Sequence, residues 1–156
     1  MVICRSRQLF TTTFLPVMFN APIKIVWEAW TRPEHIAQWW GPKGMETKVV
    51  EHDFRVGGRW KYTMQMPDGN EFLSFGVYSV IVEPQKVFSS ANFIPMTEGV
   101  EIQALFEENG NQTQFTFHVI HPTKACRDQQ EQMGIYNGWG SVFDRLQTLV
   151  ATLNHK

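Results

Sequence analysis

The chain has few charged side chains and no run of basic residues. Lys and Arg number 14, Asp and Glu number 15, and charged residues make up 19% of its 156 residues. Nucleic-acid surfaces and anionic membranes are bound through clusters of basic residues, so we expect neither as a partner. No stretch approaches the ~20 consecutive apolar residues that a membrane-spanning helix requires. The composition indicates a protein that neither binds nucleic acid nor spans a membrane.

Cysteine is scarce too. Cys4 and Cys126 lie far apart in the sequence, and neither has a metal-ligating neighbour. A disulfide between them stays an alternative, but two reduced thiols are the better interpretation. The first seven residues resemble the basic start of a signal peptide, yet three threonines interrupt the apolar run that should follow. We therefore expect a cytoplasmic protein.

Recognisable catalytic and metal-binding motifs are lacking. The sequence has no Gly-x-Ser-x-Gly nucleophile motif and no phosphate-binding loop. Its five histidines include no pair at the spacing of metal ligands on a helix. His118 and His121 are predicted to point to opposite faces of a strand, which argues against a shared metal. We expect no metal and no cofactor.

Four residues are weak candidates for acid–base catalysis. Glu101 alternates with the apolar Ile102 and is therefore expected to face solvent, although a buried carboxylate at this position would have a shifted pKa. His118 together with Tyr62 or Tyr78 is the other conceivable acid–base group. We assign a catalytic role to none of the four.

Tryptophan is concentrated between residues 29 and 40, which hold three of the six. Thr31 and Glu34 stand at the spacing of a capping box, with Pro33 in the first turn, which predicts a helix over residues 31–40. Gly41 and Pro42 would end it. The preceding residues 23–30 have apolar side chains at helical spacing and predict another short helix.

Most of the remaining chain alternates apolar and polar residues, as strands do. In residues 59–66 the side chains of one face are Trp60, Tyr62, Met64 and Met66. Turn residues such as Pro67 and Gly69, and Gly110 between two asparagines, separate the runs. Predicted strands cover residues 9–19, 47–54, 59–66, 72–82, 87–93, 100–106 and 114–120. Pro16 would hold the first of them at an edge of the sheet.

Apolar residues recur every three or four positions in the C-terminal part, which predicts one helix over residues 124–153 with Thr123 as its N-cap. Gly134, Gly138 and Gly140 interrupt it, and each costs about 1 kcal/mol relative to alanine. Either close packing against the sheet or open space for a ligand would explain them.

Together these elements predict a single α+β domain over residues 1–156. In this helix-grip arrangement, a curved antiparallel sheet of six to seven strands wraps around the long C-terminal helix. Two short helices follow the first strand.

The sequence also resembles a known family. The resemblance rests on Trp39-Trp40-Gly41-Pro42, Gly57-Gly58, Pro67-Asp68-Gly69, Gly76-Val77-Tyr78 and Gly138-Trp139, in this order and spacing. It covers about residues 14–153. The chain is similar to the START-like (SRPBCC) superfamily and, within it, to the bacterial AHSA-type domains named for the activator of Hsp 90 ATPase. Proteins of the superfamily include lipid carriers, hormone receptors, aromatic cyclases and chaperone regulators.

The resemblance implies an apolar cavity between the sheet and the C-terminal helix, closed at one end by the two short helices. The residues expected to bind a ligand there are aromatic and methionine side chains: Trp39, Trp40, Trp60, Tyr62, Met64, Met66, Trp139 and Phe143. Ordinary core packing is the alternative for each of them.

The favoured function is non-enzymatic binding of a small hydrophobic or amphipathic molecule. The alternatives are a regulator that activates the ATPase of the chaperone Hsp 90, and an enzyme of the cyclase or hydrolase type using the same cavity. A homodimer is a further open alternative, since an exposed strand edge tends to be covered.

Overall fold

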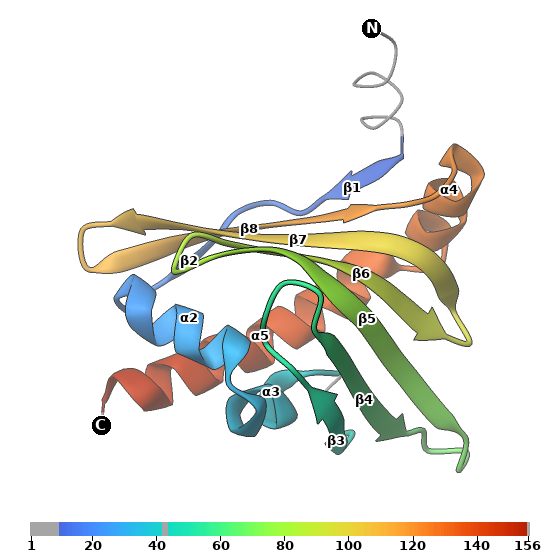
Figure 1. The fold of residues 1–156 in the computed structure, drawn as a ribbon, viewed down its shortest axis with the longest axis horizontal. Coiled ribbons are helices and arrows are strands. Elements are labelled where there is room, and N and C mark those ends of the chain that lie inside the picture. Colours follow the sequence, from blue (N-terminus) through green and yellow to red (C-terminus); the bar gives the residue numbers. More distant parts are fainter. Residues whose placement is uncertain (1–9, 42–43, 156) are drawn as a thin grey trace, which may run out of the picture.

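A curved antiparallel sheet carries three helices, among them the long C-terminal one, on one of its faces (Figure 1). The computed structural model describes residues 10–41 and 44–155. Its elements along the chain are β1 (Thr11–Thr13), β2 (Val17–Phe19), α2 (Ile23–Thr31), α3 (Pro33–Trp39), β3 (Thr47–His52), β4 (Arg59–Gln65), β5 (Glu71–Val82), β6 (Lys86–Ile94), β7 (Thr97–Asn109), β8 (Gln112–Ile120), α4 (Lys124–Gln132) and α5 (Ile135–Asn154).

From β3 to β8 each strand pairs with the next one along the chain. The strand order is β1-β8-β7-β6-β5-β4-β3, and β2 also pairs with β8. The predicted turns are confirmed: Gly69 has a φ of 88°, and Asp68 Oδ1 accepts a hydrogen bond from the Asn70 backbone N–H at 2.9 Å. Gly110, with a φ of 63°, joins β7 to β8. Local turn chemistry therefore fixes the meander.

The N-terminal strand predicted over residues 9–19 is instead two short strands, which brings the sheet to eight. β1 and β2 both pair with β8, and Pro16 lies between them. Proline has no backbone N–H to donate to a neighbouring strand, so the ladder is interrupted there. The predicted edge position is confirmed, while Leu9 lies outside the described residues.

The predicted capping box at Thr31 is wrong. Thr31 is the last residue of α2, and its hydroxyl donates to the Trp27 carbonyl at 2.8 Å. Arg32 is extended, with φ −85° and ψ 130°, because the residue before a proline is disfavoured in the helical region. Pro33 then begins α3.

Pro33 also explains the position of a buried tryptophan. Proline has no N–H to bond to the carbonyl of Ala29, four residues earlier in the chain. The indole Nε1 of Trp39 donates to that carbonyl at 2.8 Å. Trp39 is thus fully buried with its one donor satisfied, and it joins α2 to α3.

The single C-terminal helix predicted over residues 124–153 is also wrong. α4 and α5 are separate, and Gly134 between them has a φ of 91°, which favours glycine. The predicted N-cap is confirmed, since Thr123 Oγ1 accepts from the Cys126 backbone N–H at 3.0 Å. α5 has 20 residues, so it is about 30 Å long.

α5 lies across the inner face of the sheet, with α2 and α3 beside it (Figure 1). It buries Val142, Phe143, Leu146, Leu149 and Val150. The Arg145 guanidinium donates to the carbonyls of Gln38 and Gly41, both at 2.7 Å, at the C-terminal end of α3. This contact holds α3, and with it Trp40, against α5. In the part of the chain that is described, no helix has both the length and the apolar character needed to cross a membrane.

Candidate functional site

A cavity of about 260 Å³ lies between the inner face of the sheet and the start of α5. Its wall is mainly apolar and contains side chains from the strands β4 to β8 and from α4 and α5. The lining residues are Trp40, Gly41, Met45, Met64, Met66, Phe72, Ser74, Phe93, Met96, Thr97, Val119, His121, Gln130, Met133, Gly134, Ile135, Gly138, Trp139 and Val142.

Methionine dominates the wall: five of the seven methionines line the cavity, namely Met45, Met64, Met66, Met96 and Met133. Met64 is buried, whereas Met96 and Met133 are 44% and 52% exposed and lie at the mouth. Because the thioether side chain is flexible and polarisable, it suits surfaces that adapt to ligands of different shape.

Open space rather than close packing surrounds the three glycines at the start of α5, and Gly134 has in addition the positive φ that favours glycine. A Cβ added to Gly134, Gly138 or Gly140 would meet no atom within 4 Å. Gly134 and Gly138 line the cavity, while Gly140 does not. Only Gly41, which would place a Cβ against Met64 Sδ, is tightly packed among the lining glycines.

Four of the eight residues predicted to bind a ligand lie on the cavity wall: Trp40, Met64, Met66 and Trp139. The rings of Trp40 and Trp139 are nearly perpendicular, with centroids 5.7 Å apart. The Trp40 indole is held by its Nε1, which donates to Ser74 Oγ at 3.3 Å. They come from three parts of the chain that the sequence indicated: the end of α3, the region of β4, and α5.

The other four predicted residues do not reach this cavity. Trp60 and Tyr62 face a separate void of about 20 Å³, and Trp40 lies between the two spaces because it lines both. Trp39 is hydrogen-bonded to the Ala29 carbonyl. Phe143 packs against Phe117 in the core, with ring centroids 5.2 Å apart. Residue parity predicts which face of a strand is buried, but not which part of that face the helices cover.

None of the four weak catalytic candidates lines the cavity. Glu101 and His118 lie on the outer face of the sheet, where Glu101 accepts from Gln103 Nε2 at 3.0 Å and His118 Nδ1 is 3.0 Å from Thr13 Oγ1. Tyr62 and Tyr78 are buried beside the small void, and burial raises the pKa of both phenols above their ordinary value. Their geometry gives no support to an enzyme built on these residues.

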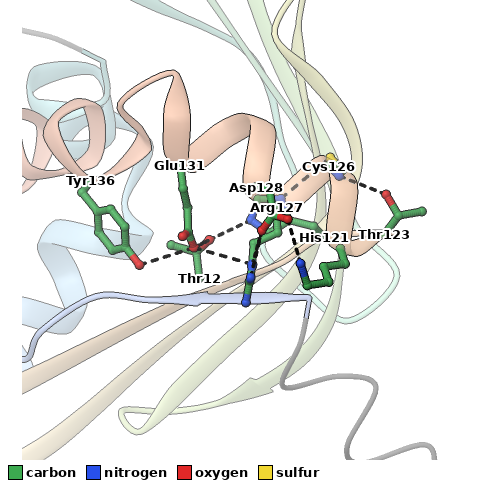
Figure 2. Close-up of polar contacts among 9 residues, drawn as sticks. Thr12, His121, Thr123, Cys126, Arg127, Asp128, Glu131 and Tyr136 are labelled. Carbon is green, nitrogen blue, oxygen red and sulfur yellow. Dashed lines mark hydrogen bonds and ion pairs between the residues drawn. The ribbon is translucent and has the colours of Figure 1, made fainter.

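Sequence reasoning missed His121, which it considered only as a metal ligand. This side chain is 2% exposed and lines the cavity. Its Nε2 lies 2.9 Å from Thr12 Oγ1, and Thr12 donates in turn to Glu131 Oε2 at 3.0 Å (Figure 2). The opposite faces predicted for His118 and His121 are confirmed. The sequence did contain one indication: His121 is two residues after Val119, so both side chains point to the same, inward face of the sheet.

Burial lowers the pKa of His121, opposed by the nearby Glu131 carboxylate and reinforced by Arg127. Burial likewise lowers the pKa of His52 and His118. Across the described ranges, no group of three or more His, Cys, Asp or Glu side chains is placed to hold a metal ion.

Acid is expected to destabilise the fold through His121. In the unfolded chain this imidazole takes up a proton near its ordinary pKa of about 6.5, whereas the folded protein resists protonation until a lower pH. Stability is therefore lost as the pH falls from about 6.5 toward the folded pKa, by up to about 1.4 kcal/mol per pH unit.

Urea unfolding at about pH 7.5 and pH 5.5 measures this loss. His121→Gln should reduce the loss of stability between the two pH values. His118→Gln should reduce it less, because His118 lies on the outer face of the sheet, although burial lowers its pKa too. Equal losses in wild type and His121→Gln would contradict the assignment.

The sheet, the long α5 and the cavity between them define a helix-grip protein with an internal apolar cavity. Residues 20–151 match the family described as Activator of Hsp90 ATPase homolog 1-like protein. The chain belongs to this family, as its resemblance to the AHSA-type domains predicts. A comparison with curated proteins found no match to the chain.

Solved bacterial structures share the fold. A protein from Mycobacterium smegmatis is 24% identical, with 94% of each chain covered and a TM-score of 0.82. One from Nitrosomonas europaea is 24% identical, covers 95% of this chain and 98% of its own, and has a TM-score of 0.81. The AHSA1-like protein from Aeromonas hydrophila is 22% identical over 93% of this chain and 97% of its own, with a TM-score of 0.71. At these identities the likeness concerns the fold alone.

Proposed function

We propose that the protein binds a small hydrophobic or amphipathic molecule in the cavity between the sheet and α5. The observation that carries the proposal is the five-methionine wall, set opposite Trp139 and the open surface of Gly138. The cavity volume of about 260 Å³ is slightly below the range of ligand sites, which span roughly 300–1,000 Å³. A ligand of about two fused rings fits that size.

If the ligand site were chosen by volume alone, a different part of the surface would be favoured. A groove of about 580 Å³ lies beside the hairpin turns, but Lys86, Glu107 and Glu108 are part of its lining. Exposed charges keep their water and contribute little to binding an apolar molecule. The smaller, methionine-lined cavity is therefore the better site.

Native mass spectrometry of protein purified from its own host tests the proposal. A co-purifying neutral mass, displaced by added naphthalene, would support it. If no mass co-purifies and calorimetry detects no naphthalene binding at its solubility limit, the proposal fails.

Two helix glycines provide a matched pair of variants. Gly138→Ala and Gly140→Ala should each raise the free energy of unfolding by about 0.5–1 kcal/mol, because alanine is the better helix former and a Cβ has room at both positions. Gly138 lines the cavity and Gly140 does not, so only Gly138→Ala should weaken naphthalene binding. Thermal unfolding and calorimetry provide the two measurements, and equal affinity of the two variants would contradict the assigned site.

Regulation of a chaperone is the second candidate, and the family's description as Hsp90 ATPase activator homologues favours it. Stimulation of a bacterial Hsp90 ATPase by the purified chain would support this role, and its absence at saturating protein would remove it. The cytoplasmic location, the single domain over residues 1–156 and a homodimer stay predictions.

A further inference from the structure

The hydrogen-bond chain at His121 determines which of its ring nitrogens carries the proton. Thr12 has one hydroxyl proton, and it is donated to the Glu131 carboxylate. Towards His121 the hydroxyl oxygen can then only accept, so Nε2 carries the hydrogen. In the neutral ring, Nδ1 is left as an acceptor. Its neighbour is the Cys126 thiol, whose Sγ lies 3.9 Å away, at the outer limit for a weak sulfur donor.

Gln130 places another acceptor on the same wall. The side chain is 5% exposed and lines the cavity. Its Nε2 donates to the Met96 carbonyl at 3.2 Å and approaches Met133 Sδ at 4.0 Å. The amide NH2 is therefore engaged by the protein, while no donor among the described residues reaches Oε1. An amide oxygen that the protein leaves unpaired can accept a hydrogen bond from a ligand.

Resting on the proposed function, we propose that the ligand is a neutral hydroxylated ring compound, an alcohol or a phenol. Its rings lie against the methionines and Trp139, and its single O–H donates to one of the two acceptors, His121 Nδ1 or Gln130 Oε1. Thr12 and Glu131 act as positioning residues, because they hold Nδ1 in its accepting form.

The two acceptors select against other polar groups. A carboxylate brings only lone pairs and a negative charge toward Nδ1 and Oε1, so the contact is repulsive. An ammonium group can donate, but it would lose its hydration against the apolar wall. An ether of the same shape has no proton to give. A hydroxyl group supplies a donor to one of these acceptors without carrying a charge.

Calorimetry with four naphthalene derivatives tests the proposal. 2-Naphthol should bind the wild-type protein about tenfold more tightly than 2-methoxynaphthalene, as expected for one net hydrogen bond. 2-Naphthoate, an anion at pH 7, should bind at least a hundredfold more weakly than 2-naphthol. Naphthalene itself separates the two claims: if it fails to bind, the proposed function fails, whereas if it binds with the affinity of 2-naphthol only the hydroxyl claim is overturned.

Variants locate the contact. Gln130→Leu and His121→Phe should each reduce the preference for 2-naphthol over 2-methoxynaphthalene, and the double variant should remove it while naphthalene still binds. Ser89→Ala is the matched control, because Ser89 is a buried hydroxyl that accepts from a tryptophan, Trp60, at 2.7 Å but does not line the cavity, so the preference should be unchanged. Naphthalene binding by each variant confirms that its cavity is formed. An unchanged preference in the double variant, or its loss in Ser89→Ala, would overturn the proposal.

Discussion

Trp39→Ala should lower the free energy of unfolding by about 3–5 kcal/mol, the range for removing a large aromatic side chain from a core. Trp39 is fully buried, and its ring lies 4.8 Å from Trp30 and 5.5 Å from Trp40. The upper end of the range is expected, because the change also leaves the Ala29 carbonyl without a donor. Urea unfolding at pH 7.5 measures the loss.

Trp139→Ala is the matched control for this variant. Trp139 is only partly buried and borders the cavity, so part of its surface faces space that is already open. The loss of stability should be clearly smaller than for Trp39→Ala, whereas naphthalene binding should weaken about tenfold or more. A larger stability loss for Trp139→Ala than for Trp39→Ala would contradict the division between core and cavity wall.

Gly76→Ala should destabilise the sheet by about 3 kcal/mol or more. Gly76 lies in β5, where a Cβ would be 1.9 Å from the Ser90 carbonyl oxygen of β6 and 3.0 Å from the Trp60 ring. A backbone atom cannot move aside as a flexible side chain can, so the two strands must separate locally. Overpacking of this kind typically costs about 1–3 kcal/mol, and more where backbone must shift.

Val77→Ala, at the next position of β5, is its control, because this side chain is 40% exposed. Val77→Ala should lower the free energy of unfolding by less than about 1 kcal/mol, as ordinary surface substitutions do when some strand propensity is lost. Thermal unfolding of both variants provides the comparison. Similar melting temperatures would show that β5 and β6 are not packed as closely as the structure has them.

Much of the fold could be predicted from the sequence, because strands and turns depend on local patterns. The alternation of Trp60, Tyr62 and Met64 predicted the buried face of β4, and Gly69 predicted the hairpin after it. The two C-terminal helices could not be separated in the same way. Gly134 was interpreted as a residue within a helix, since nothing local revealed its left-handed backbone.

The error at Thr31 has a different cause. Two local rules compete there: the capping-box spacing of Thr31 and Glu34, and the exclusion of helical backbone at Arg32 by Pro33. The proline constraint is steric and prevails over a hydrogen bond of modest net energy. Thr31 then bonds back to Trp27.

The sequence predicted an apolar cavity between sheet and helix, but only some of the residues that line it. Trp40 and Trp139 could be selected from the sequence because aromatic side chains at element ends suit a cavity wall. Met96, Met133 and His121 come from connecting segments that converge only in three dimensions. Gln130 gave no signal at all, because a single glutamine on a polar helix is ordinary in any sequence.

The methionine methyl groups offer the most direct test of the central claim, that the cavity is a ligand site. With ¹³C-labelled methionine methyl groups, NMR titration with naphthalene should shift the signals of Met45, Met64, Met66, Met96 and Met133, which line the cavity. Met18, which is 40% exposed on β2 and lines a different groove, should keep its position. Unchanged cavity signals at saturating naphthalene, or shifts confined to Met18, would contradict the account.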